Sequence, residues 1–308
     1  MSEYLIPTLP LSYDLETKEI LRQVNRANRK LAELKGVALT IPNEQILISS
    51  LTLQEAKDSS EVENIVTTQD DLYRAGMEIP YDIISAATKE VLLYREAISE
   101  GFRLVRNKNI LTLNDIKRIQ QILEANSAGF RSTPGTQLKR SSDGVVVYTP
   151  PQDKVVIEKY MANLEQFIND EQLSSLDPLI KMAIIHHQFE SIHPFRDGNG
   201  RTGRILNVLF LCQKGYLDAP ILYASSYIIK NKNEYYALLR TAKETEQYEE
   251  IVSYMLHSFK DTAEHTLRIV ESIKALLAQS TDKDYLLTLK GQYEPLYNTV
   301  NLIFKKVY

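Results

Sequence analysis

The sequence predicts a mainly α-helical protein, a helical bundle with one β-hairpin flap. Three observations lead to that fold class. Apolar residues recur three and four positions apart through most of the chain, as they do on one face of a helix. Only the segment 136–148 has the residue pattern of two short strands joined by a turn. A glycine-rich loop at 193–204 separates two strongly apolar segments, so this loop should join two core helices.

The N-terminal region reads as successive helices. In the first helix, the apolar residues of one face are Ile20, Val24, Ala27, Leu31 and Leu34. Gly36 is expected to end that helix. A second helix is expected over 43–57, and Asp58, Ser59 and Ser60 would then cap a short new helix that starts near Glu61.

The middle of the chain combines helices with the hairpin. Helices are expected over 81–106, 112–125 and 153–170. Strands at 136–140 and 145–148 would be joined by a turn that contains Asp143 and Gly144. An isolated hairpin is only marginally stable, so it should lie over the bundle as a flap.

Two buried helices should flank the loop at 193–204. Asp177 and Pro178 form a typical helix start, a cap followed by proline at the first helical position. The apolar stripe of the first helix comprises Leu179, Met182, Ile185, Phe189 and Ile192. The stripe of the second helix comprises Ile205, Val208, Leu209 and Cys212, and Gly215 closes it.

Composition narrows the class of protein. The chain has 308 residues, 36 basic and 40 acidic, with a formal net charge of −4, and this balance argues against broad nucleic-acid binding as a function. Cys212 is the only cysteine, so no internal disulfide can form. No signal peptide and no membrane-spanning segment is expected, so the expected location is cytoplasmic and the expected partners include no membrane.

The loop at 193–204 has the composition of an anion-binding site. Gly198, Asn199 and Gly200 allow backbone N–H groups to point into one concavity. The loop runs into a helix N-terminus, which attracts phosphate. Arg201 and Arg204 lie three residues apart and offer bidentate donors. These features together predict a polyphosphate cradle.

Two further side chains in the loop suggest chemistry. Asp197 offers a hard oxygen ligand for Mg²⁺. His193 ends the preceding helix, and an imidazole near its ordinary pKa is the most common general base at neutral pH. Each residue alone has an ordinary structural explanation, as a cap, a turn or a surface charge. Their occurrence together within 12 residues favours nucleotidyl or phosphoryl transfer.

This segment resembles the signature of the Fic family, His-Pro-Phe-x-Asp/Glu-Gly-Asn-Gly-Arg-x-x-Arg, and matches every specified position from His193 to Arg204. The resemblance extends over about residues 40–260 and implies a Fic-type helical bundle. It implies a protein adenylyltransferase that moves AMP from ATP to a Ser, Thr or Tyr hydroxyl of a target protein and releases pyrophosphate. ATP would be the substrate and Mg²⁺ the cofactor.

The resemblance also implies a role for each position. His193 would deprotonate the target hydroxyl, and Asp197 would bind Mg²⁺ at the phosphates. Gly198, Asn199 and Gly200 would hold the phosphates through backbone N–H groups and the asparagine amide. Arg201 would neutralise the pyrophosphate, and Arg204 would bind the terminal phosphate. The flap near 136–148 would dock the target segment. A homodimer is a possible assembly of the chain.

A second segment resembles the inhibitory helix of the same family, Ser/Thr-x-x-x-Glu-Gly/Asn, through Ser59, Glu63 and Asn64. This resemblance places an inhibitory helix near 59–65. It implies that Glu63 pairs with Arg204 where the terminal phosphate belongs and so lowers basal activity. Ser60 and Glu63 also have the spacing of a capping box, and we expect both interpretations to hold.

Other segments have less specific assignments. The resemblance places Tyr235 and Tyr236 near the adenosine, with core packing as the competing explanation. The expected division is an N-terminal helical region at 1–110, a Fic core at 111–260 and a C-terminal helical extension at 261–308. The stretch 296–305 resembles only the beginning of a winged helix.

Three other functions compete with AMP transfer. One is a silent nucleotide-binding regulator, and another is a hydrolase that removes AMP from modified protein, with Glu63 orienting a water. The third is a metal-dependent hydrolase using His186, His187, His193 and Asp197, which would leave the two arginines unexplained. The absence of a Gly-Lys-Ser/Thr motif after a strand excludes a P-loop enzyme.

Overall fold

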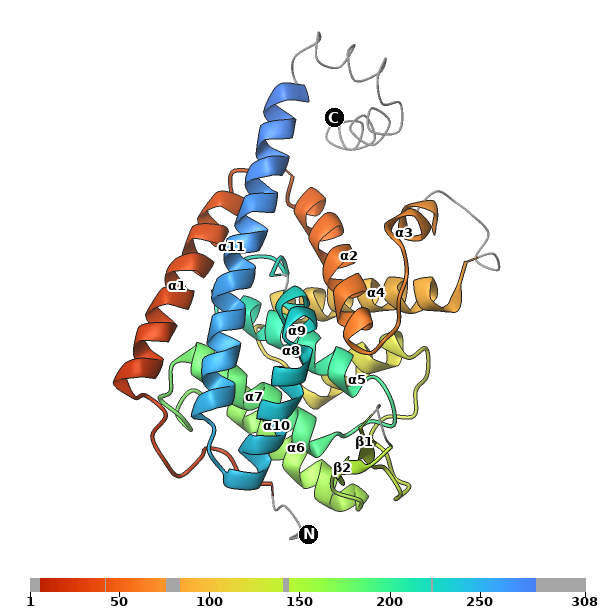
Figure 1. Ribbon diagram of the computed structural model, residues 1–308, viewed down its shortest axis with the longest axis vertical. Helices are drawn as coiled ribbons and strands as arrows, with labels where there is room; N and C mark the ends of the chain where they lie inside the picture. Colours follow the sequence, from red (N-terminus) through yellow and green to blue (C-terminus); the bar gives the residue numbers. More distant parts are fainter. Residues whose placement is uncertain (1–5, 42, 76–83, 141–143, 223, 281–308) are drawn as a thin grey trace.

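The computed structural model describes residues 6–41, 43–75, 84–140, 144–222 and 224–280. This part of the chain is mainly α-helical with one two-stranded antiparallel hairpin, as predicted (Figure 1). In chain order the elements are α1 (Lys18–Ala38), α2 (Glu44–Val62), α3 (Gln69–Ala75), α4 (Ala86–Lys108), α5 (Leu113–Leu123), β1 (Leu138–Lys139), β2 (Val146–Tyr148), α6 (Lys154–Asn169), α7 (Pro178–Ile192), α8 (Asn199–Gln213), α9 (Ser225–Lys230), α10 (Lys232–Thr245) and α11 (Glu249–Ser280).

Helices α7 and α8 form the centre of the bundle. The Asp177 carboxylate accepts the N–H of Leu179 at 2.8 Å, and Pro178 opens α7, so the predicted helix start is confirmed. Every residue of α7 from Leu179 to Ile192 is buried, and most of α8 is buried as well. The loop between them is therefore held on both sides by core helices.

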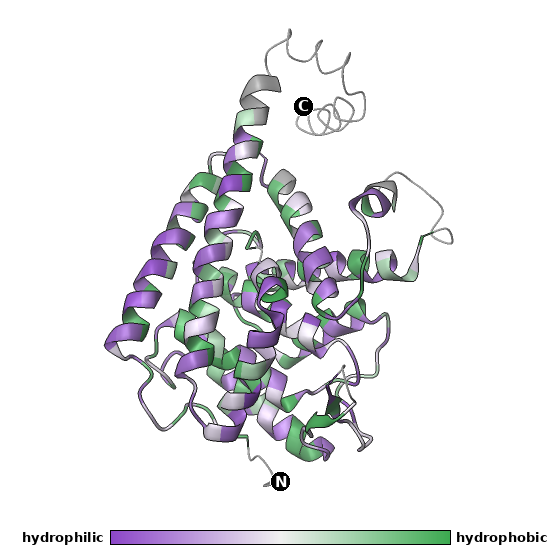
Figure 2. Cartoon of the chain, in the orientation of Figure 1, coloured by the Kyte–Doolittle hydropathy of each residue, from purple (hydrophilic) through white to green (hydrophobic). Residues whose placement is uncertain are grey.

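Helices α1 and α11 lie side by side along one flank of the molecule (Figure 1). Their apolar faces turn inward and their polar faces outward (Figure 2). The prediction that Gly36 ends α1 is wrong, because the helix continues to Ala38. Val37 and Ala38 pack against the core, and that packing outweighs the modest helix preference of glycine.

Helix α2 is one continuous helix to Val62, so the predicted break at 58–60 and the new helix near Glu61 are wrong. Two residues beyond its last residue, Asn64 adopts a φ of 64°. The N–H of Asn64 bonds the carbonyl of Glu61 at 2.9 Å, and the N–H of Ile65 bonds that of Ser60 at 3.0 Å. These two bonds form a Schellman motif, a C-terminal cap that needs a residue tolerant of positive φ.

The predicted capping box of Ser60 and Glu63 is also absent. Ser60 is buried, and its hydroxyl has no hydrogen-bond partner among the described residues. Ser59 is bonded to a residue of α8 instead of capping a helix. The polar residues at 58–60 are thus accounted for by tertiary packing, which a local pattern does not reveal.

The hairpin pairs β1 with β2, with Leu138 opposite Tyr148 and Lys139 opposite Val146. Most of its predicted turn, residues 141–143, lies outside the described residues. The same holds for 281–308, which include the predicted winged-helix-like stretch. The short helices α3 and α9 were not predicted, since each has only 6 or 7 residues.

No helix in the described ranges is both long and apolar enough to cross a membrane.

Candidate active site

Helix α7 ends at His193, which adopts the left-handed conformation with φ 48°. Its N–H still bonds the carbonyl of Phe189 at 2.9 Å. Burial lowers the pKa of the imidazole to about 4, and the nearby cations Lys243 and Arg131 add to the effect. The expectation of a pKa near the ordinary value is therefore corrected. The imidazole is neutral at pH 7 and can accept a proton.

The loop after His193 is fixed by its own side chains. Phe195 is buried and packs against Phe130 and Phe189, with ring centroids 5.3 and 6.3 Å away. The Asn199 amide accepts the N–H of Phe195 and donates to its carbonyl, both at 2.8 Å. The Asn199 amide is thus used within the loop, and anion contacts from this segment fall to backbone N–H groups.

The N-terminus of α8 supplies those groups. Gly198 has φ 76°, in the left-handed region that favours glycine. The first intrahelical bond runs from the N–H of Thr202 to the carbonyl of Gly198 at 2.9 Å, so the N–H groups of residues 199–201 precede it. Such free N–H groups at the positive end of a helix bind anions.

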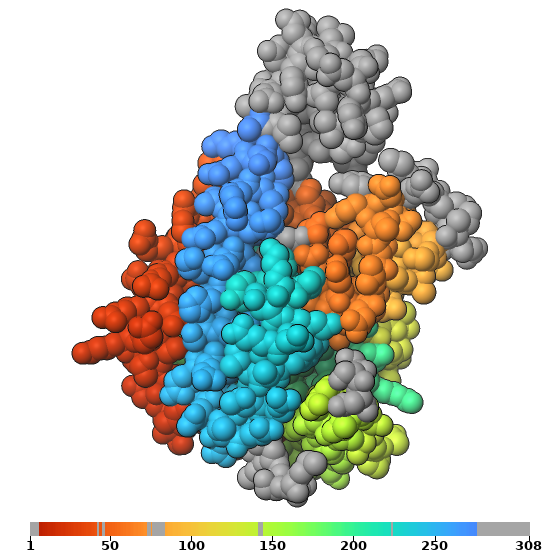
Figure 3. All heavy atoms as spheres, viewed as in Figure 1, coloured from red at the N-terminus to blue at the C-terminus, as the bar shows by residue number. Residues whose placement is uncertain are grey.

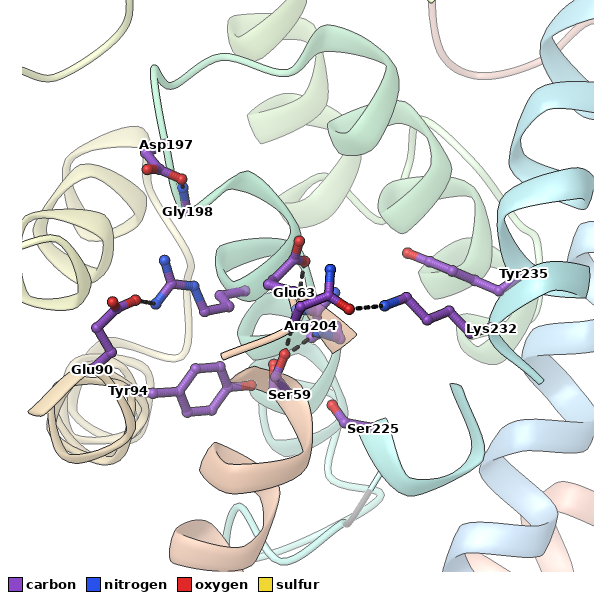
Figure 4. Close-up of polar contacts among 12 residues, drawn as sticks. Ser59, Glu63, Glu90, Tyr94, Asp197, Gly198, Arg204, Ser225, Lys232 and Tyr235 are labelled. Carbon is purple, nitrogen blue, oxygen red and sulfur yellow. Dashed lines mark hydrogen bonds and ion pairs between the residues drawn. The ribbon is translucent and has the colours of Figure 1, made fainter. Parts of the chain in front are cut away.

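Arg204 lies beneath this helix end, and its side chain is 1% exposed. Its Nη2 donates to Glu63 Oε1 at 2.9 Å and to the carbonyl of Ser59 at 2.9 Å, and its Nε donates to Ser59 Oγ at 2.7 Å. Figure 4 shows Ser59 and Glu63 directed at Arg204. The sequence-predicted pair of Glu63 and Arg204 is therefore present in the structure.

The electrostatics of this pair follow from its burial. Burial alone would raise the pKa of Glu63, but the charge of Arg204 and the hydrogen bond from it outweigh burial and lower that pKa. The side chain of Asn64 accepts a hydrogen bond from Lys232 Nζ at 2.9 Å, which connects the end of α2 to the start of α10.

Glycine at position 200 allows the close approach of Glu63. A Cβ at Gly200 would collide with the Glu63 carboxylate and lie 3.0 Å from Nη1 of Arg204. A Cβ at Gly198 would similarly collide with Glu124. Two carboxylates therefore lie against the glycines of the motif.

Arg201 has its own acidic partners, which the sequence did not reveal. Its side chain is 4% exposed, and it donates to Glu90 at 2.8 Å and to Glu124 at 2.9 Å. Glu90 comes from α4, and Glu124 follows the last residue of α5. Burial raises the pKa of Glu124, against the opposing effect of Arg201.

Asp197 lies at the edge of the site with an exposed side chain beside Gly198 (Figure 4). One of its oxygens accepts the N–H of Gly198 at 2.8 Å. Mg²⁺ is commonly held by one or two carboxylates together with phosphates and water, so an exposed carboxylate beside an anion-binding helix end fits that ion. In the described part of the chain, no group of three or more His, Cys, Asp or Glu residues forms a metal site.

Tyr235 lies in the protein interior with the histidines of α7, whereas Tyr236 lies at the surface. Tyr235 is buried, and its hydroxyl lies 2.7 Å from Nε2 of His186. His187 Nε2 lies 3.3 Å from the carbonyl of Leu239. Burial lowers the pKa of both histidines to about 3. Tyr236 is 44% exposed, which leaves its ring accessible.

Three segments share one face of the molecule. In the space-filling view, α2 adjoins the α9–α10 region, and the flap segment lies below them on the same face (Figure 3). Contacts of α2 with α8 and α9 agree with that view.

Comparison with known proteins agrees with this architecture. Residues 21–103 match the Fic/DOC family N-terminal model, and residues 110–211 match the Fic/DOC family model. The protein adenylyltransferase fic-1 of Caenorhabditis briggsae is 35% identical over 95 residues, which are 31% of this chain and 17% of that protein. The protein adenylyltransferase Fic of Drosophila mojavensis is 33% identical over 112 residues, 36% of this chain and 20% of that protein. The alignments thus span only about a fifth of these relatives.

Solved structures show the same fold. A Fic family protein from Desulfovibrio desulfuricans superposes with a TM-score of 0.67 at 21% identity, over 83% of this chain and 76% of the other. Fic-1 from Caenorhabditis elegans superposes with a TM-score of 0.59 at 18% identity, over 82% and 73%. Sequence and fold lead to the same conclusion: the chain belongs to the Fic/DOC family.

Proposed function

We propose that this chain is a protein adenylyltransferase that transfers AMP from ATP to a Ser, Thr or Tyr hydroxyl of a target protein. The observation that carries the proposal is the arrangement around the N-terminus of α8. Free N–H groups, two buried arginines and a neutral histidine converge there. The relatives named as protein adenylyltransferases support it.

The nucleotide phosphates would lie on the helix end. The N–H groups of residues 199–201 would bond their oxygens, and Arg201 and Arg204 would neutralise their charge. Asp197 would hold Mg²⁺, which when bound shields the negative charge of the α- and β-phosphates. Tyr236, with its exposed ring, is the better placed of the two tyrosines to contact adenosine.

In the reaction, the target hydroxyl oxygen bonds to the α-phosphorus, and the bond from that phosphorus to the bridging oxygen breaks. The hydroxyl proton passes to His193, and pyrophosphate leaves with the electron pair. A neutral imidazole is the form that can accept this proton. Because the phosphates of ATP are anionic, their binding would raise the pKa of His193 toward its useful range.

The target segment would dock on the flap near 136–148, where the short strands β1 and β2 can accept a further strand. We expect the protein to act in the cytoplasm.

We further propose that Glu63 restrains the enzyme. Its carboxylate holds Arg204, so it occupies the place of the terminal phosphate. Ser59 keeps the guanidinium in position, and Asn64 ends the helix that presents Glu63. ATP bound against this contact would have its α-phosphate misaligned for attack, which lowers the rate more than the affinity.

The test uses ATP labelled at the α- or γ-phosphate, with Mg²⁺ and a cell lysate. Wild type should label proteins weakly, Glu63→Gly strongly and His193→Ala not at all, and only the α-label should transfer. Transfer of the γ-label would indicate a kinase. If Glu63→Gly gives no protein label while it still binds ATP, the adenylyltransferase proposal fails.

One observation favours a second candidate function, removal of AMP from modified protein. The Glu63 carboxylate is 35% exposed, has a lowered pKa and acts electrostatically on His193, so it could orient a water for hydrolysis. This activity requires wild-type Glu63 to release AMP from an adenylylated protein that Glu63→Gly leaves intact. The opposite result rejects it.

A further inference from the structure

Arg131 is a buried cation whose bonding partners are backbone carbonyls. It lies between α5 and β1 and is 6% exposed. Among the described residues, the hydrogen bonds of its side chain all go to backbone carbonyls, and burial lowers its pKa. A buried charge is costly unless it is well paired, so its contacts should matter.

One set of contacts holds the end of α7. Arg131 Nε donates to the carbonyl of His193 at 2.8 Å, and Nη2 lies 3.4 Å from that of Ile192. The Arg131 N–H donates to the carbonyl of Pro194 at 2.9 Å. A helix end leaves such carbonyls without partners, and His193 adopts a φ of 48° that few non-glycine residues adopt. The bonds therefore fix the backbone from which the imidazole projects.

The other contact holds the base of the flap. Arg131 Nη2 also donates to the carbonyl of Pro151, three residues after β2 ends at Tyr148. Tyr148 itself donates to the carbonyl of Ser191 at 2.6 Å, on α7. The flap is thus tied to the end of α7 at two points, through Arg131 and through Tyr148.

The His193 imidazole lies among charged groups from several parts of the chain. The groups that act on His193 are the cations Lys243 of α10 and Arg131, the carboxylate of Glu63 at the end of α2, and the carbonyl of Glu190 on α7. Lys243 Nζ lies 3.8 Å from the centroid of the Tyr148 ring, and Lys243 and Glu190 act on each other electrostatically. Removing Arg131 would leave Lys243 as the only cation among these groups.

We propose that Arg131 is a positioning residue for AMP transfer, which fixes the flap and its docked hydroxyl relative to the imidazole of His193. The inference rests on the proposed function of His193 and of the flap. It assigns Arg131 no contact with ATP.

The test compares Arg131→Gln and Arg131→Lys in the Glu63→Gly background. Both should lower kcat by about 10- to 100-fold, because small misplacements of reacting groups are costly, while KM for ATP stays within about twofold. Arg131→Gln should also move the acidic limb of the pH–rate profile to higher pH, whereas Arg131→Lys, which keeps the charge, should not. Arg22→Gln, at an arginine that is 69% exposed on α1, controls for net charge.

A second measurement does not depend on activity. The His193 ring is titrated by NMR, with its signal assigned by comparison with His193→Ala. Its pKa should rise in Arg131→Gln and stay near the parent value in Arg131→Lys. If Arg131→Gln does not fold, Tyr148→Phe removes the other connection between the flap and α7, the hydrogen bond to Ser191. It should lower kcat without moving the acidic limb of the pH–rate profile.

The outcomes distinguish the two proposals. An unchanged kcat and an unchanged His193 titration in Arg131→Gln overturn the positioning role. A rise in KM for ATP in proportion to the loss of kcat also overturns it, since it indicates a nucleotide contact or general damage. If Glu63→Gly transfers no AMP while Arg131→Gln still shifts the His193 titration, the proposed function fails and the link from Arg131 to His193 stands.

Discussion

At the scale of single residues, Glu63 compensates the positive charge of the buried Arg204 guanidinium. Among the described residues, Glu63 is the carboxylate that forms an ion pair with it, at 2.9 Å. Removing one partner of a fully buried pair costs about 3–5 kcal/mol, but Glu63 is partly exposed and solvent screening reduces the figure. We expect Glu63→Ala to lower the free energy of unfolding by about 1–2 kcal/mol.

ATP should compensate for this loss. Its terminal phosphate can replace the carboxylate beside Arg204, so ATP with Mg²⁺ should raise the melting temperature of Glu63→Ala more than that of wild type. Glu61→Ala, on the same helix, serves as the matched control in thermal and urea unfolding. Equal ATP-induced shifts in wild type and Glu63→Ala would contradict the shared position of carboxylate and phosphate.

The pH dependence of this contact has a definite sign. The pKa of Glu63 lies below its ordinary value of 4.5 in the folded protein. Its contribution to stability is therefore fully present above that value and is lost as pH falls through the folded-state pKa. The stability difference between wild type and Glu63→Ala, measured in urea, should shrink as the pH falls below about 4.5.

The motif residues could be found from sequence because they are contiguous. From His193 to Arg204 one loop and one helix turn bring them together, and the local pattern of residue types predicts the chemistry. Glu90, Glu124 and Arg131 could not be found in this way. Glu90 lies 111 residues from Arg201, and Glu124 lies 77 residues away, so no periodicity connects them.

At the scale of elements, the end of α2 sets the position of Glu63. Asn64 has φ 64° and closes the helix. A β-branched residue in that conformation costs roughly 1–2 kcal/mol, whereas glycine adopts it freely. We expect Asn64→Val to lower stability and to raise basal AMP transfer, because Glu63 is held less firmly.

Asn64→Gly is the matched comparison. It keeps the backbone conformation and loses only the bond from Lys232. Its basal transfer, measured with α-labelled ATP, should stay closer to wild type than that of Asn64→Val. The reverse order would show that the Lys232 bond matters more than the helix cap.

A second contact of α2 anchors it to α9. Glu55 is buried and accepts the N–H of Ser225 at 3.0 Å, and Ser225 Oγ also donates to it. Burial raises the pKa of Glu55 to about 7. The folded protein then holds a proton that the unfolded chain releases above the ordinary value of 4.5, so stability falls as pH rises between 4.5 and 7.

Glu55→Gln should remove this part of the dependence of the unfolding free energy on pH, which is at most about 1.4 kcal/mol per pH unit for one proton. Urea unfolding at several values between pH 5 and pH 8 measures it, with Glu61→Gln as control. Some slope should remain, because burial also raises the pKa of Glu190. An unchanged slope in Glu55→Gln would contradict the assignment.

The sequence predicts which helices and strands exist better than it predicts the residues at which they end. The periodicity located α1 and α4 to α6, which each bury one face, and the apolar runs located α7 and α8, which are buried almost throughout. The turn residues located the hairpin. The end of α2 was missed because serines and aspartate resemble a helix start when their tertiary partners are unknown. Ser59 bonds a residue 145 positions away, and that contact replaces the expected cap.

At the scale of the whole molecule, the packing of α1 along α11 joins the two ends of the described chain. Leu31 of α1 is fully buried, whereas Leu21 on the same helix is 42% exposed. Leu31→Ala should cost about 2–5 kcal/mol, and Leu21→Ala should cost much less. Urea unfolding checks the stability, and ATP affinity should be unchanged because this flank does not line the site.

The order of helices could be read from the sequence, but their pairing could not. A stripe such as that of α1 shows that one face is buried and does not say against which element. The segment before α1 illustrates this point. Leu9 exchanges two hydrogen bonds with Asn163, and Gln188 donates to the carbonyl of Pro7, across more than 150 residues in each case.

The absent side chain at Gly200 constrains how this protein can vary. Alanine there would push away the Glu63 carboxylate and would also fill the space above Arg204 where we place the terminal phosphate. Loss of restraint through this position would therefore damage nucleotide binding as well. Changes at Glu63 or Asn64 carry no such penalty. A natural variant that loses the restraint by Glu63 is therefore expected to carry changes at the end of α2 and to keep the motif at 193–204 intact.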